Sequence, residues 1–152
     1  MVHLGNAKVR QRMVQRIALL RPDTPRQWGK MTAGQMVCHL NDSFQAAMGR
    51  KLVSPASGML QRTVVKWGAL YVPLRWPQGV PTRPEVEQGA GGTAPGDFGR
   101  DRATLIASLE RFCDPNRASP WQPHPIFGGM TDRQWLRWGY LHTDHHLRQF
   151  GV

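Results

Sequence analysis

The sequence predicts an all-α fold, an antiparallel four-helix bundle with a long crossover between helices two and three. Three observations support this fold class. Apolar residues recur at helical spacing in four segments, two of these segments open with the same capping box, and no segment shows the alternation of a β-strand. Because 152 residues can bury a substantial core, we expect a single helical-bundle domain over residues 1–152.

The first two helices are predicted from apolar spacing and from a cap. Residues 6–20 should form the first helix, since apolar side chains recur there at helical intervals: Val9, Met13, Ile17 and Leu20. The prolines and glycine of RPDTPRQWG end it. Thr32 and Gln35 have the spacing of a capping box, so the second helix should run from about Thr32 to about Met48.

The second half of the chain contains a long crossover and two more helices. The weaker apolar segment GMLQRTVVKWGALYV predicts a short helix inside the crossover. Residues 73–97 include 10 Pro or Gly among 25, which excludes regular structure for most of this stretch, and loops of this length are usually functional or mobile. A helix should follow from roughly Asp97 to Phe112. The last helix should begin at the capping box of Thr131 and Gln134.

Charge and cysteine content limit the classes of partner. The net charge is +10, but the basic residues are spread along the chain, and we expect Lys8, Arg12 and Arg16 to form a solvated face instead of a nucleic-acid site. No apolar run could span a bilayer and no secretory signal is visible, so we expect no membrane partner and a cytoplasmic protein. The two cysteines, Cys38 and Cys113, form neither a disulfide framework nor a metal motif.

Three of the six histidines lie within five residues near the end of the chain, in YLHTDHHLRQFGV. On a helical wheel, His142 and His146 fall on the apolar face together with Trp135, whereas Asp144 points away and His145 lies at the border. A pair of histidines at i and i+4 on a buried face can present two imidazoles to one metal ion. The same pair could also form hydrogen bonds to neighbouring helices.

A third ligand is available in the second helix. His39 lies in QMVCHLNDSF, and although a lone core histidine is more often a hydrogen-bonded structural residue, the pair in the last helix favours a metal site of His39, His142 and His146. Three imidazoles with an open fourth position are typical of a catalytic site. We expect a divalent ion, zinc or nickel first and iron or copper as alternatives. Carboxylate di-iron chemistry does not fit, because the chain has only three glutamates: Glu85, Glu87 and Glu110.

Three segments resemble the DinB/YfiT-like superfamily, and within it a branch of DinB-like metal-binding four-helix bundles. They are WGKMTAGQMVCHLNDS, HPIFGGMTDRQW and HTDHHLRQFG. The likeness covers nearly the whole chain and is weakest in residues 73–97. In this superfamily one histidine of the second helix and an HxxxH pair of the last helix bind a divalent metal, and His39, His142 and His146 occupy the matching positions. The resemblance also implies a homodimer.

The resemblance implies a reaction class as well. Characterised members of the superfamily include thiol S-transferases that use bacillithiol or mycothiol, and a mycothiol-dependent maleylpyruvate isomerase. It therefore implies a metal-dependent thiol S-transferase, which passes a low-molecular-weight thiol to an electrophilic substrate through a metal-bound thiolate. The alternatives are a metal-dependent hydrolase, a non-catalytic metal-binding stress-response bundle, and a basic binder of nucleic acid or membrane surfaces, which net charge alone would support.

Five further residues are candidates for roles around the metal. Gln149, one turn beyond the histidine pair, could orient a ligand imidazole or contact a bound molecule, and His124 in PHPIFGG could act as an acid/base or form a structural hydrogen bond. Asp42 and Ser43 follow His39 by one turn; for Asp42 we expect a surface or capping position. We expect His145 to be exposed.

Overall fold

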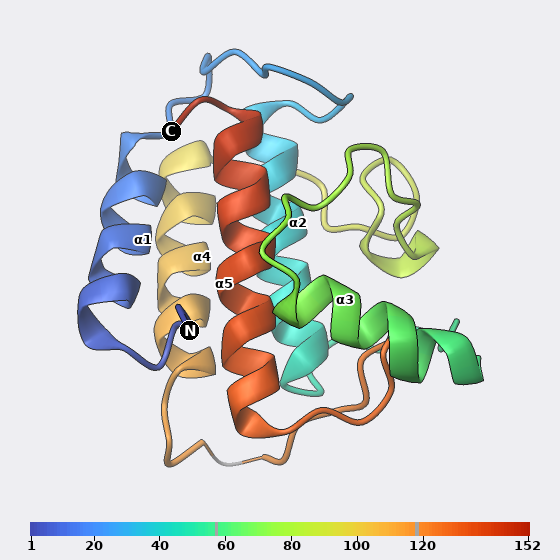
Figure 1. Ribbon diagram of the computed structural model, residues 1–152. Helices are drawn as coiled ribbons and strands as arrows, with labels where there is room; N and C mark the ends of the chain where they lie inside the picture. The colour runs from blue at the N-terminus through green and yellow to red at the C-terminus, as the bar shows by residue number, and fades with distance from the viewer. Residues whose placement is uncertain (57, 118) are drawn as a thin grey trace.

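The structure is a computed structural model that describes residues 1–56, 58–117 and 119–152. Within these residues the regular structure is entirely helical, as the all-α expectation requires, and no strand is present; the single β-bridge joins His124 to Gly128. Five α-helices are formed (Figure 1): α1 (Ala7–Leu19), α2 (Ala33–Ala47), α3 (Lys66–Tyr71), α4 (Phe98–Phe112) and α5 (Asp132–Gln149). A π-helix, η1 (Gln61–Val65), leads into α3, and a 3₁₀ turn, η2 (Pro84–Val86), lies in the crossover.

The four long helices α1, α2, α4 and α5 lie side by side, and α3 packs against α5 and extends away from them to one side (Figure 1). Their contacting faces carry the buried apolar residues that the spacing predicts. α1 contributes Met13 and Ile17, and α4 contributes Leu105 and Leu109. No helix in the described part of the chain is long and apolar enough to cross a bilayer.

Both predicted capping boxes are present. The Thr32 hydroxyl accepts a hydrogen bond from the Gln35 amide at 3.2 Å, and the Gln35 side chain accepts one from the Thr32 amide at 2.9 Å. Thr131 and Gln134 repeat the arrangement at 3.3 and 3.0 Å. Since each box satisfies two free backbone donors, it fixes the residue at which the helix begins and therefore the face on which each later side chain lies.

Gly139 allows α5 to approach its neighbours closely. A Cβ atom placed on it would lie 2.8 Å from Cε1 of Phe112 on α4 and 3.0 Å from Cδ1 of Leu4. Both distances are too short for an undisturbed carbon contact. The absence of a side chain at this position therefore leaves room for the Phe112 ring and the Leu4 side chain against α5.

The predicted basic stripe on α1 is only partly solvated. Lys8 and Arg12 are exposed, but Arg16 donates hydrogen bonds to Asp144 at 2.6 Å and to the Val152 carbonyl oxygen at 2.8 Å. The expectation of a solvated position was wrong for Arg16, because a carboxylate on α5 and the end of the chain lie within its reach. This arginine instead links α1 to α5.

Candidate metal centre

Three imidazole nitrogens from two helices meet between α2 and α5. His39 Nε2 lies 3.3 Å from His142 Nε2, and His146 Nε2 lies 3.2 Å from the same atom. A ligand nitrogen from each of the three residues lies within 4.8 Å of the other two. With Zn–N bonds of about 2.0–2.1 Å, a tetrahedral ion has its ligand nitrogens about 3.3–3.4 Å apart. The two short separations match this value.

The positions of the protons on two of these rings follow from their partners. His39 Nδ1 lies 2.9 Å from the Val86 carbonyl oxygen, and His146 Nδ1 lies 2.9 Å from Gln149 Oε1. The amide of Gln149 is itself oriented, because its Nε2 donates to the Trp28 carbonyl oxygen at 2.9 Å. Since both partners of Nδ1 are acceptors, each Nδ1 carries the proton and each neutral ring directs the lone pair of Nε2 into the cluster.

This arrangement leaves lone pairs facing one another. Of the three Nε2 atoms, those of His39 and His146 act as acceptors, and His142 Nε2 can donate a proton to only one of them. A cation placed among the three nitrogens would satisfy all of them at once, which no single proton does. The donor set therefore fits a divalent metal ion with imidazole ligands.

The cluster is neutral at ordinary pH. Burial lowers the pKa of all three histidines, and it lowers the pKa of His146 to about 3. The pKa of His142 lies well below its usual value, first because of burial and then because the neighbouring imidazoles would repel its charge. The Nε2 atoms of His39 and His146 would therefore not need to lose a proton before a metal ion binds at pH 7.

Aromatic side chains form the walls beside His142. Trp138 of α5 stacks on its ring with the centroids 4.8 Å apart, and Trp76 from the crossover lies 6.2 Å away. The indole of Trp76 is held by a 2.8 Å hydrogen bond to the carbonyl oxygen of Ala69. His142 as a whole residue is partly buried, whereas His39 and His146 are buried.

His145 differs from expectation. It is half-buried, with its ring 6.0 Å from Trp28, 6.3 Å from Trp76 and 5.1 Å from His146, and burial lowers its pKa. Its Nδ1 is buried and has no hydrogen-bond partner among the described residues. The prediction of an exposed position was wrong because two segments outside α5, which the helical wheel does not include, cover this residue.

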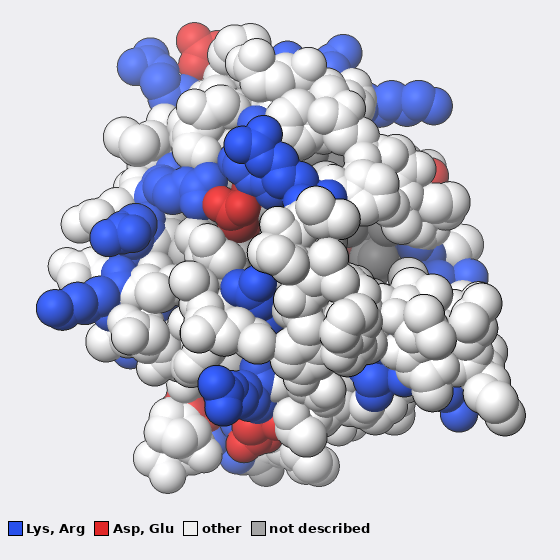
Figure 2. Space-filling model, viewed as in Figure 1, with Lys and Arg blue, Asp and Glu red and all other residues white. Residues whose placement is uncertain are grey.

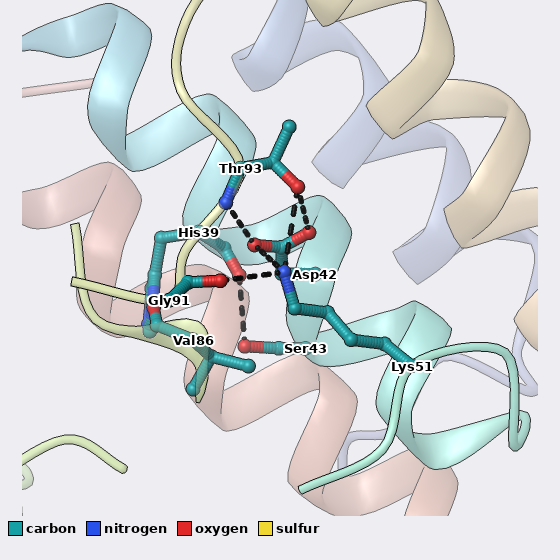
Figure 3. Close-up of polar contacts among 7 residues, drawn as sticks. All are labelled: His39, Asp42, Ser43, Lys51, Val86, Gly91 and Thr93. Atoms are coloured by element: carbon teal, nitrogen blue, oxygen red, sulfur yellow. Dashed lines mark hydrogen bonds and ion pairs between the residues drawn. The ribbon is translucent and has the colours of Figure 1, made fainter. Parts of the chain in front are cut away.

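Asp42 is also buried, with 2% of its surface exposed, so the expected surface or capping position was wrong. Its carboxylate accepts hydrogen bonds from the Thr93 amide and hydroxyl, both at 2.7 Å, and forms an ion pair with Lys51 at 2.8 Å (Figure 3). The Lys51 ammonium also donates to the Gly91 carbonyl oxygen at 3.1 Å. Asp42 therefore attaches the crossover to α2.

This attachment supports the metal ligand on the same helix. Val86, whose carbonyl oxygen orients His39, lies in the segment that Asp42 and Thr93 hold against α2 (Figure 3). Ser43 has no such role, because its hydroxyl donates to the backbone oxygen of His39 at 2.8 Å and does not contact the imidazole. The crossover thus provides the outer partner of His39 through a backbone atom.

The structure brings one of the two candidate catalytic residues to the cluster. Gln149 contacts His146, as described above. His124 lies outside the cluster: its Nδ1 accepts the backbone N–H groups of Ile126 and Phe127, both at 3.1 Å, and its ring stacks on Phe127 with centroids 4.4 Å apart. Burial lowers the pKa of His124 to about 3, so the ring is a neutral acceptor that shapes this loop.

Sequence reasoning missed two contributors from the crossover, Val86 and Trp76. The Val86 contact uses a backbone carbonyl, which leaves no trace in side-chain type. Cys38, beside His39, points away from the cluster: it is buried, its Sγ lies 3.7 Å from Asp101 Oδ2, and burial raises its pKa to about 11. It remains a protonated thiol outside the cluster.

Comparison with known proteins yields one match. A family model described as "Protein of unknown function (DUF1569)" matches residues 7–151. Neither the curated proteins nor the solved structures include a match to this chain. The matched range contains all five α-helices and all three histidines of the cluster.

Proposed function

Since this chain belongs to the DUF1569 family, whose description names no activity, we propose its function from the site: a metal-dependent enzyme that transfers a small thiol to an electrophile. The observation that carries the proposal is the convergence of three Nε2 atoms, two of them with no proton to offer. The ion would be divalent, zinc or nickel first and iron or copper as alternatives. When bound, it would hold the sulfur of a small thiol as a thiolate, the form that attacks an electrophilic carbon.

The residues of the chain would position and shield this chemistry. Val86 and Gln149 hold two ligand rings so that Nε2 faces the ion. Trp76 and Trp138 form apolar walls that would exclude water from the reacting atoms. The unpaired Nδ1 of His145 offers a hydrogen-bonding atom to a molecule bound beside the cluster.

The proposal extends to the fold and to the compartment. We place the four long helices in the antiparallel bundle of the DinB/YfiT-like superfamily, with α3 in the crossover between α2 and α4. Support comes from the helix order and from the source of the three histidines, one from α2 and two from α5. The cytoplasm is the proposed compartment, supported by the free thiols of Cys38 and Cys113.

Metal content tests the first step. Protein purified without added metal or an affinity tag should carry about one divalent ion per chain, and the His39→Ala variant should carry almost none. His145→Ala is the matched control, because it removes an imidazole beside the cluster that is not one of the three converging ligands. Equal metal content in wild type and His39→Ala would contradict the proposed site.

Turnover tests the second step. A chromogenic aryl halide supplied with a low-molecular-weight thiol should release halide only when metal, thiol and protein are all present. A metal-dependent hydrolase would instead turn over an ester substrate without thiol. A non-catalytic metal-binding protein would lose thermal stability on chelation and show neither activity.

A further inference from the structure

The helical segment of residues 59–71, which we call the arm, carries an exposed apolar stripe. It comprises two helical residues, Met59 and Leu60, followed by η1 and α3, and it projects beyond the long helices (Figure 1). Four large exposed side chains recur at i, i+4, i+7 and i+11: Leu60, Val64, Trp67 and Tyr71. The preceding Met59 is also exposed, with 85% of its surface accessible. A contiguous patch of this kind on a small protein usually marks an interaction site.

The opposite side of the arm contacts the protein. Leu70 is fully buried, the Lys66 ammonium donates to the Gly129 carbonyl oxygen at 3.0 Å, and the Arg62 side chain lies against Gly128. A surface helix normally turns its apolar face to the core and its cations to water. Most of the arm's large apolar residues are instead directed away from the protein, so its amphipathic pattern is turned outward.

The sequence on both sides of the arm is cationic, although Lys51 is paired with Asp42. Residues 43–84 contain six Lys or Arg and no Asp or Glu, although the whole chain has ten acidic residues. Beside the arm, the exposed Leu74 is followed by the exposed Arg75, which donates no hydrogen bond and forms no ion pair in the described structure. Figure 2 shows this side of the molecule as a largely white lobe with blue side chains at its edges.

We propose that the arm lies on the surface of an anionic lipid bilayer. Its stripe would enter the boundary between headgroups and acyl chains, where Trp and Tyr are favoured, and the exposed Arg75 beside the arm would face lipid phosphates. A second copy of the chain is a poorer occupant, because it would bring two acid-free, cationic segments together. A helix that lies in the interface needs no spanning segment, so this contact is compatible with the lack of a membrane-spanning helix in the described part of the chain.

Vesicle co-sedimentation tests the proposal on the full chain. The probes are vesicles of phosphatidylcholine alone and vesicles with about one quarter phosphatidylglycerol, at low and high salt. The test variant is Leu60→Ser/Trp67→Ser, and both positions are exposed, so its fold should persist. The control is Leu19→Ser, an equally exposed leucine on α1. Light scattering on the same samples gives the oligomeric state.

We expect the wild-type protein to bind the anionic vesicles and the double variant to bind them at least roughly ten-fold more weakly. Binding by Leu19→Ser should equal that of wild type. Salt should weaken the binding, and a chelator should not change it. Insensitivity to chelator separates this result from the fate of the metal site. Absence of binding to anionic vesicles, or equal binding of the double variant, would overturn it. The proposal would also be overturned if the wild-type protein were a dimer, the double variant a monomer, and neither bound vesicles. That result would assign the stripe to contact with a second copy of the chain.

Discussion

Two helical segments of this molecule depart from the usual amphipathic pattern in opposite directions. α5 directs the polar side chains of His142, His146 and Gln149 into the protein, whereas the arm directs large apolar side chains such as Trp67 into solvent. On α5, hydrogen bonds compensate the buried polar atoms: His146 Nδ1 bonds Gln149 Oε1, and Gln149 Nε2 donates to the Trp28 carbonyl oxygen. On the arm, Leu60, Val64 and Trp67 are each more than 60% exposed, and in the described structure only Tyr71, at one end of the stripe, bonds α5, through Gln134.

The comparison shows that buried polar side chains and exposed apolar side chains each require a partner of matching chemistry. Burying three imidazoles is unfavourable unless their nitrogens are satisfied, and the protein satisfies the outer nitrogens of two rings with its own atoms. The inner nitrogens are the atoms at which we propose that a cation binds. The exposed stripe of the arm also lacks a partner in the described structure, but because its side chains are apolar, the partner has to be apolar too.

Replacing His142 should have the largest effect on the polar side of this comparison. His142 Nε2 takes part in both short contacts of the cluster, so His142→Ala leaves only two nitrogens for the ion. Competition with a chromophoric chelator should show metal affinity reduced by more than about 100-fold, with circular dichroism unchanged. An affinity close to that of wild type would mean that the ion binds elsewhere.

Lowering the pH should reduce the free energy of unfolding through the buried histidines. The arm should not contribute to this loss, because it contains no histidine. His124 and His146 have a pKa of about 3 in the folded protein, against 6.5 for a solvated histidine, so the unfolded chain takes up protons first as the pH falls. The free energy of unfolding of the metal-free protein should be level above pH 6.5 and should fall below it, by on the order of 2 kcal/mol per histidine at pH 5. Urea unfolding at pH 7.5 and pH 5 measures this loss, and His124→Gln should remove the share of one histidine.

The outer partner of His146 should matter less than a ligand. Gln149→Leu leaves Nδ1 of His146 and the Trp28 carbonyl oxygen without their partner, and metal affinity should fall by about 10- to 100-fold. Gln149→Glu keeps an acceptor oxygen for His146 and is expected to restore most of the affinity. If leucine and glutamate gave the same affinity, the proposed orienting role of Gln149 would be excluded.

The smallest effect should come from the arm. Trp67 is 61% exposed and Trp138 is 6% exposed, so the same substitution tests the two environments. Trp67→Ser should change the free energy of unfolding by less than about 0.5 kcal/mol, whereas Trp138→Ser should cost about 3–5 kcal/mol. Denaturant unfolding measures both values; a large loss for Trp67→Ser would indicate that the stripe is buried in solution.

The sequence predicted the features that depend on local chemistry. Capping boxes at Thr32 and Thr131 fixed where α2 and α5 begin, and helical periodicity then placed His39, His142 and His146 on inward faces. These inferences need only the neighbours within one or two turns. For that reason the three histidines could be grouped from the order of residues alone, although their role as metal ligands remains a prediction.

The features that the sequence did not predict depend on where the crossover packs against the long helices. Asp42 is buried because Thr93, 51 positions further along, reaches its carboxylate, and a segment rich in Pro and Gly has no periodicity from which that return could be predicted. The arm has the same limit. Its apolar spacing is identical whether the stripe faces the core or the solvent, and only the contacts of Leu70 and Lys66 decide between them.

Gly139 has a consequence beyond packing. It lies three residues before His142, and its lack of a side chain allows α5 to touch Phe112 and Leu4. An alanine there would meet the Phe112 ring and the Leu4 side chain, so one of these side chains or α5 itself would have to shift. Since His142 follows within one turn of the same helix, an empty space at Gly139 helps to set the position of its imidazole relative to His39.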